Sequence, residues 1–229
     1  MITFLLPLDN GCPRGYLGPG GISEEGRYFN CTGGAAGKID NWLLTPNHIY
    51  KRPTAQVMYH TGPYDPEGIL GTLTSIVLCF LGVQCGRILT SYQSHKERIG
   101  RFLFWGLVLG AIATGLCEGK QNEGLIPINK NLWSLSFILL MASFAFFLFS
   151  LFYVLCDVVQ VWSGSPFRFP GMNSILVYVS SDIFYNYFPF VWAQQGNSHM
   201  NYLSANIVAV ILWILLSYYW FKIDFFVKI

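Results

Sequence analysis

The sequence predicts an all-α protein, a polytopic bundle of membrane helices that carries one large polar loop. Hydrophobic residues make up 53% of its 229 residues and charged residues only 11%, whereas soluble domains carry about 25% charged residues. Mean hydropathy is +0.42, so we expect an integral membrane protein. Five apolar stretches are candidates for the roughly 20-residue length of a membrane span, and they are residues 68–92, 102–117, 132–156, 171–190 and 204–221.

The chain begins with residues 1–8, which are apolar but too short to cross a membrane. They are typical of the last turns of a sixth helix, so we expect the chain to be the C-terminal part of a longer protein. Residues 9–67 follow as a polar loop rich in glycine, a residue that suits turns and close backbone approach. We expect this loop to form an ordered lid, and residues 68–229 to form the five-helix membrane region with a short tail.

The distribution of charge predicts the side of the membrane that each polar segment occupies. One short connection and the C-terminal tail are dense in basic residues, so the positive-inside rule places both in the cytosol; these residues are Arg87, Lys96, Arg98, Arg101, Lys222 and Lys228. Residues 9–67 then lie on the luminal side, where the sequon at Asn30 can accept a glycan. An oxidising lumen also permits a disulfide between Cys12 and Cys31. Pairing of Cys12 with Cys117, or with a cysteine upstream of the chain, stays open.

Small residues recur at helical spacing on the first three predicted spans. Small faces let membrane helices approach closely, so we interpret them as packing faces, which also permit a homodimer. They are Gly82 with Gly86, Gly106 with Gly110, and Ser136 with Ser143 and Ser150.

The fourth predicted span, residues 171–190, carries polar side chains along one helical face. If this helix starts at Gly171, Asp182 falls near the bilayer midplane, where a carboxylate costs about 2.5–3.5 kcal/mol on insertion scales. Two interpretations stay open: a structural hydrogen bond between helices, or one wall of a functional cavity. The candidates for that wall are Asn173, Ser174, Tyr178 and Asp182.

A second polar group lies at the luminal mouth of the third predicted span. Asn129 or Asn131 is suited to cap this helix, Trp133 to anchor it at the interface, and Lys130 to snorkel toward water. Alternatively, the positive end of the helix dipole and the Lys130 ammonium face an anionic or carbonyl group of a substrate. In that case the cavity candidates here are Glu123, Asn129, Lys130, Trp133 and Ser134.

Several function classes receive no support from the sequence. The net charge of +2 argues against a nucleic-acid partner. The chain has no nucleotide-binding glycine loop, no nucleophile elbow and no cysteine–histidine set with metal-ligand spacing. We therefore expect no metal site, and we interpret the four histidines as loop or surface residues.

Five motifs, in order along the chain, resemble one family. They are GCPRGYLGPGGI, NCTGGAAGKID, YDPEGILGT, NEGLIPINKNLWSLS and PGMNSILVYV, and they are similar to the C-terminal half of the heparan-alpha-glucosaminide N-acetyltransferase family of lysosomal membrane enzymes. The resemblance implies acetyl transfer from cytosolic acetyl-CoA to the terminal glucosamine of heparan sulfate in the lysosomal lumen. It also implies a multi-pass protein of the lysosomal membrane, with lipid, acetyl-CoA, heparan sulfate and an N-terminal part of the same protein as its partners.

The resemblance also implies that the chain lacks a catalytic residue. The family's catalytic histidine belongs to a luminal segment that would lie upstream of Met1, so we expect the chain alone to be inactive. Vertebrate members have His-Glu where this chain has Ser181-Asp182, so the carboxyl group is kept and the imidazole is not. Two alternatives remain: a membrane transporter built around Asp182, or a catalytically dead membrane scaffold.

Overall fold

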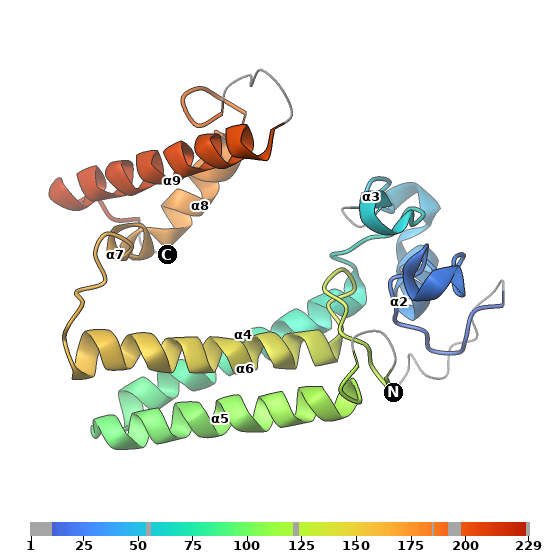
Figure 1. Ribbon diagram of the computed structural model, residues 1–229, viewed down its shortest axis with the longest axis horizontal. Helices are drawn as coiled ribbons and strands as arrows, with labels where there is room; N and C mark the ends of the chain where they lie inside the picture. The colour runs from blue at the N-terminus through green and yellow to red at the C-terminus, as the bar shows by residue number, and fades with distance from the viewer. Residues whose placement is uncertain (1–10, 54–55, 121–123, 185, 192–197, 228–229) are drawn as a thin grey trace. The chain divides into compact units, whose positions relative to one another are not determined.

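The computed structural model describes residues 11–53, 56–120, 124–184, 186–191 and 198–227, and every element in these ranges is a helix (Figure 1). The predicted helix end at residues 1–8 lies outside them. The short helices come first and lie within the predicted lid: η1 (Ser23–Gly26), α2 (Gly34–Leu44), η2 (Pro46–His48) and α3 (Gln56–Tyr59). The longer helices follow: α4 (Ile69–Ser91), α5 (His95–Leu116), α6 (Leu135–Tyr153), which continues as the π-helix η3 (Val154–Val158), and α9 (His199–Lys222).

Within the ranges that the structure describes, four helices are long and apolar enough to cross a membrane: α4, α5, α6 with η3, and α9. They match four of the five predicted spans, and α5 extends its span by seven residues toward the N-terminus, beginning at His95. The prediction of an all-α, multi-pass membrane protein is therefore confirmed, while the number of five spans is not.

The predicted span at residues 171–190 is broken into shorter pieces. Here the chain forms α7 (Arg168–Met172) and α8 (Ser174–Ile183), and the ten residues of α8 extend only about 15 Å. The hydrocarbon core is about 30 Å thick, so α8 cannot cross it. Pro189 explains why a helix cannot continue to residue 190, because proline lacks an N–H and disfavours helical geometry in the residue before it. Asp182 therefore lies in the last turn of α8 and not at the middle of a span.

The chain divides into two compact units, one ending at Val154 and the other starting at Leu155. In the first unit, α5 packs along α6 around Phe102, Phe146 and Tyr153, which are all at most 5% exposed. The Ser143 hydroxyl donates a 2.7 Å hydrogen bond to the Gly106 carbonyl across this interface. The predicted small faces of α5 and α6 thus meet each other.

The glycine pair on α4 behaves differently. A Cβ added at Gly82 or Gly86 would meet no atom within 4 Å. Among the described residues, this predicted packing face has no neighbour.

Residues 11–67, which we call the lid, form a packed structure beside the start of α4. Cys12 and Cys31 form a disulfide with their Cα atoms 5.7 Å apart. A small second core joins Ala36 and Tyr64 of the lid to Leu132, which precedes α6. Closing a loop of 19 residues with a disulfide contributes about 3 kcal/mol in chain-entropy accounts, so the lid has both a covalent and an apolar source of order.

The second unit contains α7, α8 and α9. The Phe169 ring of α7 lies 5.0 Å from that of Tyr218 and 5.1 Å from that of Phe221, both on α9. After α8, the Phe190 ring stacks on Trp213 of α9 with centroids 4.3 Å apart. Aromatic contacts therefore hold the short elements of this unit to its one long helix.

Candidate binding pocket beside the lid

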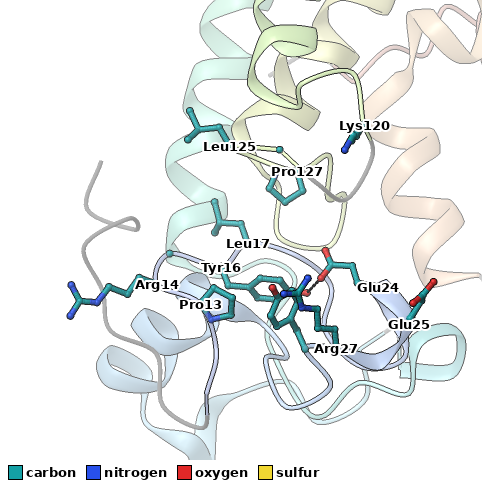
Figure 2. A pocket seen from close by; sticks show the side chains of 13 residues that line it. Pro13, Arg14, Tyr16, Leu17, Glu24, Glu25, Arg27, Lys120, Leu125 and Pro127 are labelled. Carbon is teal, nitrogen blue, oxygen red and sulfur yellow. Dashed lines mark hydrogen bonds between the residues drawn. The ribbon is translucent and has the colours of Figure 1, made fainter.

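A pocket of about 780 Å³ lies between the lid and the segment that follows α5. The lid contributes residues from two stretches, 13–17 and 24–28, and the segment after α5 contributes Lys120, Gly124, Leu125 and Pro127 (Figure 2). The whole lining belongs to the first unit of the chain.

The lid wall is built around Tyr16. Its hydroxyl accepts a hydrogen bond from the Gly20 N–H at 3.1 Å and donates to Glu24 Oε2 at 3.4 Å. The ring lies 5.1 Å from that of Tyr28, and the Arg27 guanidinium carbon lies 5.3 Å from the Tyr28 centroid. Figure 2 shows Tyr16, Glu24 and Arg27 gathered together, with Arg14 directed away from them. Burial, aided by Glu24, raises the pKa of Tyr16 to about 12, so this phenol stays neutral.

Glycine fixes the backbone behind Tyr16. The Tyr16 carbonyl accepts a 2.8 Å hydrogen bond from the Ala35 N–H at the start of α2. Gly34 has φ of +51°, and a Cβ there would overlap that same carbonyl oxygen. Only glycine combines this φ with so close an approach, so Gly34 sets the distance between α2 and the pocket wall.

The opposite wall carries Lys120, Gly124, Leu125 and Pro127. Glu118 and Gly119 have positive φ and turn the chain out of α5. The Ile126 N–H then donates to the Leu116 carbonyl at 2.9 Å, which folds the segment back onto the end of α5. The Lys120 ammonium group is thereby placed on the side of the pocket that faces the lid.

Hydrogen bonds of Asn129 and Ser134 connect the two walls of the pocket. Asn129 is 5% exposed and donates through Nδ2 to the Leu17 carbonyl of the lid at 3.2 Å. Ser134 donates to the Pro127 carbonyl at 2.8 Å and accepts from the Asn129 N–H at 3.0 Å. Asn129 and Ser134 were predicted to line a cavity. They hold the walls of the pocket in place but are not among its lining residues.

The helix cap differs from the prediction. Ser134 caps α6 by accepting from the Phe137 N–H at 3.4 Å, so the prediction of Asn129 or Asn131 as the cap is wrong. The reason is a turn: the Asn129 side chain accepts instead from the Asn131 N–H at 3.0 Å. Trp133 has φ of 45°, and helical geometry therefore begins only after it.

The remaining candidates from this stretch do not line the pocket. Lys130 is exposed, and Trp133 is half-buried, with its Cβ 3.7 Å from where a Cβ of Gly71 on α4 would lie. Glu123 lies outside the described residues. Asn30, the predicted glycan acceptor, is exposed on the lid.

The polar stripe of α8 lies in the second unit, and the structure does not relate it to this pocket. Asn173 is 2% exposed; its Nδ2 donates to the Phe225 carbonyl at 2.7 Å and its Oδ1 accepts from the Val227 N–H at 3.1 Å. These bonds tie the chain after α9 to the start of α8. Ser174, Tyr178 and Asp182 are all exposed. Within its unit, only the Asn173 end of the predicted stripe is buried.

A buried carboxyl group lies at the mouth of α4. Asp40 is 1% exposed, and its Oδ1 accepts from the Ile69 N–H at 2.9 Å, which caps α4. Its Oδ2 is buried and has no hydrogen-bond partner among the described residues. Burial raises the pKa of Asp40, the bond from Ile69 opposes this rise, and the charge of Asp65 adds to it.

The chemistry of the pocket suits recognition of a polar, anionic molecule. It offers two phenol rings, the cations of Arg14, Arg27 and Lys120, and two carboxyl groups. No histidine or thiol is among its lining residues. Within the part of the chain that the structure describes, no group of histidine, cysteine and acidic residues is placed to hold a metal ion.

Sequence reasoning did not single out the residues that line this pocket. A lid was predicted, but not which of its segments face each other; the Cys12–Cys31 disulfide closes the loop that contains both residues 13–17 and residues 24–28. The sequence left three alternatives for the partner of Cys12. Pairing with Cys31 is the alternative that would have indicated that Tyr16 and Arg27 lie close together.

Comparison with known proteins gives two close relatives. The whole chain is 53% identical over 231 aligned residues to human heparan-alpha-glucosaminide N-acetyltransferase and 52% identical to the mouse protein of the same name. The chain spans 35% of the length of each of these curated relatives. No protein-family model matches the chain.

Proposed function

Because the chain belongs to the heparan-alpha-glucosaminide N-acetyltransferase family at 53% identity over its full length, we propose that it forms part of a membrane-bound N-acetyltransferase. The enzyme takes acetyl from acetyl-CoA on the cytosolic side and transfers it to the terminal glucosamine of heparan sulfate. The observation that carries this proposal is the identity, over an alignment that covers the lid and the membrane helices alike. The pocket beside the lid supports it, because its rings and charges suit an anionic sugar.

The proposed topology puts the lid in the lysosomal lumen and the basic turn between α4 and α5 in the cytosol. Arg87 at the end of α4 and Lys96, Arg98 and Arg101 at the start of α5 flank that turn and support this orientation, and Asn30 is exposed as a glycan acceptor must be. Treatment with a peptide N-glycosidase should increase the mobility of the protein made in mammalian cells, and Asn30→Gln should abolish that change. A protein that carries no glycan would contradict the luminal assignment.

Catalysis requires a base, because a glucosamine amine is largely protonated at acidic pH and must lose a proton to attack the acetyl group. The pocket lining contains no histidine, and the chain matches only about a third of its relatives' length. We therefore infer that the base comes from the part of the enzyme that the chain does not match, and that the chain alone does not acetylate glucosamine.

A chimera tests the function directly. This chain replaces the matching segment of the human relative, and membranes from cells that lack the activity are assayed with acetyl-CoA and a glucosaminide acceptor. We expect acetylation by the chimera and none by the chain alone. A chimera that reaches lysosomes in glycosylated form yet acetylates nothing, or that moves solute without acetyl-CoA as a transporter would, sinks the proposal.

We further propose that Lys130 and Asp182 each contribute to acetylation in the assembled enzyme. Both side chains are exposed and are therefore accessible to a substrate. In the chimera, Lys130→Ala and Asp182→Ala should each lower acetylation at least 100-fold with unchanged expression. Val179→Ala, also exposed on α8 and not among the cavity candidates, is the control for Asp182. Full activity in both variants would refute the assignment.

A further inference from the structure

We propose that the pocket beside the lid binds an acidic sugar of the acceptor chain, one carrying sulfate or carboxylate next to the glucosamine that is acetylated. This inference rests on the proposed function for the identity of the acceptor. It adds a subsite and its residues: Tyr16 and Tyr28 contact the sugar ring, and Arg27 and Lys120 bind its anionic group.

The rings provide the surface against which a sugar packs. Tyr16 and Tyr28 are both half-buried, with planes tilted by 52° and centroids 5.1 Å apart. Small-molecule pockets combine such aromatic walls with a few placed polar groups. The hydrogen bonds of the Tyr16 hydroxyl to Gly20 and Glu24 hold its ring in position, so little side-chain freedom remains to be lost when a ligand binds.

The cations lie on facing walls. Arg27 belongs to the lid and Lys120 to the segment after α5, and Figure 2 shows them on opposite sides of the pocket. A guanidinium group matches the planar oxygens of carboxylate or sulfate with two parallel hydrogen bonds, whereas an ammonium group acts as a point charge. A single anionic group held between them would receive charge-assisted bonds from both sides.

The carboxyl groups limit the charge of the ligand. Glu24 and Glu25 also line the pocket, and they oppose a ligand with several clustered phosphates, such as the nucleotide part of acetyl-CoA. They suit instead a ligand that has hydroxyl donors or an ammonium group beside one anionic group. This mixture is what an acidic sugar adjoining a glucosamine presents.

The volume of the pocket, and the contacts that fix its walls, are both consistent with this ligand. At about 780 Å³ it lies in the range of small-molecule sites, roughly 300–1,000 Å³, with room for more than one sugar ring. The Cys12–Cys31 disulfide and the Asn129 bond to Leu17 fix both walls before any ligand arrives.

Binding to the full chain in detergent is the first test. The probes are a sulfated heparan tetrasaccharide, the same tetrasaccharide after desulfation and carboxyl reduction, and acetyl-CoA as a competitor. We expect the sulfated probe to bind more tightly than the neutral one, and the double variant Arg27→Gln/Lys120→Gln to lose at least ten-fold in affinity. Lys51→Gln/Arg52→Gln removes two exposed lid cations that lie outside the pocket and should bind normally. Unchanged affinity in the pocket variant, or displacement of the probe by acetyl-CoA, overturns the proposal.

Kinetics of the chimera separate this inference from the proposed function. The pocket variant should raise KM for the sulfated oligosaccharide about ten-fold while kcat, and both constants for a small neutral glucosaminide, stay unchanged. Lys120→Arg should keep most of the affinity. If the unaltered chimera acetylates neither acceptor, the proposed function fails while the binding assay still decides on the pocket. Equal losses with both acceptors would assign Arg27 and Lys120 a role other than this subsite.

Discussion

Two helices of the first unit begin beside the lid, and their N-termini are satisfied in opposite ways. The N-terminus of α6 is capped by Ser134, the residue directly before the helix, and the Ser134 hydroxyl also bonds to the Pro127 carbonyl and the Asn129 N–H. The N-terminus of α4 is capped by Asp40, 29 residues before Ile69, and the second carboxyl oxygen has no hydrogen-bond partner in the described part of the chain. A satisfied cap gives stability that depends little on pH, whereas a buried carboxyl group with a spare oxygen makes stability depend on its protonation.

The largest effect is expected at Gly68, which contacts the cap of α4. A Cβ at this position would overlap the Asp40 carboxyl group, so Gly68→Ala forces Asp40 away from Ile69 and should cost about 3 kcal/mol of unfolding free energy. Thermal unfolding in detergent measures the loss. Gly82→Ala, on the same helix with no atom within 4 Å, is the control and should be neutral. Equal stability of the two variants would show that α4 does not need the Asp40 cap.

Asn129→Ala tests the link from the α6 mouth to the lid. It removes the bonds to the Leu17 carbonyl and from the Asn131 N–H, and we expect a loss of about 2–3 kcal/mol. Hydrogen exchange should also rise in residues 13–17, because their anchor is gone. Asn131→Ala is the matched amide control, since no side-chain hydrogen bond of Asn131 occurs among the described residues. If exchange in the lid stays unchanged, Asn129 does not couple the two walls.

Ser134→Ala should have a somewhat smaller effect. The variant removes the α6 cap and leaves the Asn129 N–H without its acceptor, which we expect to cost about 2 kcal/mol. Chemical unfolding of the detergent-solubilised protein measures the change, with Ser174→Ala, at an exposed position, as the control. A Ser134→Ala protein as stable as the parent would mean that another group caps α6.

The smallest effect, and the one that separates the two mouths, concerns pH. The folded pKa of Asp40 is raised above its ordinary value of 3.8, so the folded protein binds this proton more tightly than the unfolded chain does. Its contribution to stability is therefore present at acid pH and is lost as pH rises through the folded pKa. Asp40→Asn should flatten the dependence of the unfolding temperature on pH above the ordinary pKa of 3.8, while Ser134→Ala should shift the whole curve downward. A parent protein whose stability rises over this range would contradict the raised pKa.

Composition and periodicity alone predicted the all-α membrane class and the positions of four long helices. The sequence predicts this part of the fold because a helix within lipid must be apolar along about 20 residues, whatever it packs against. The predicted span at residues 171–190 shows the limit: its apolar length was sufficient, but the turn at Asn173 separates α7 from α8, and α8 ends at Ile183.

The site depended more on tertiary structure. Local sequence marked the stretch from Asn129 to Ser134 as polar and important, yet it could not say whether these groups face a ligand or the protein itself. That question is decided by contacts between residues far apart in the chain, such as Asn129 with Leu17, 112 residues away, and Asp40 with Ile69. A buried polar group takes whatever partner the fold brings to it, so the sequence determined which residues are polar, and only the folded lid decided that Tyr16, Arg27 and Lys120 line the pocket.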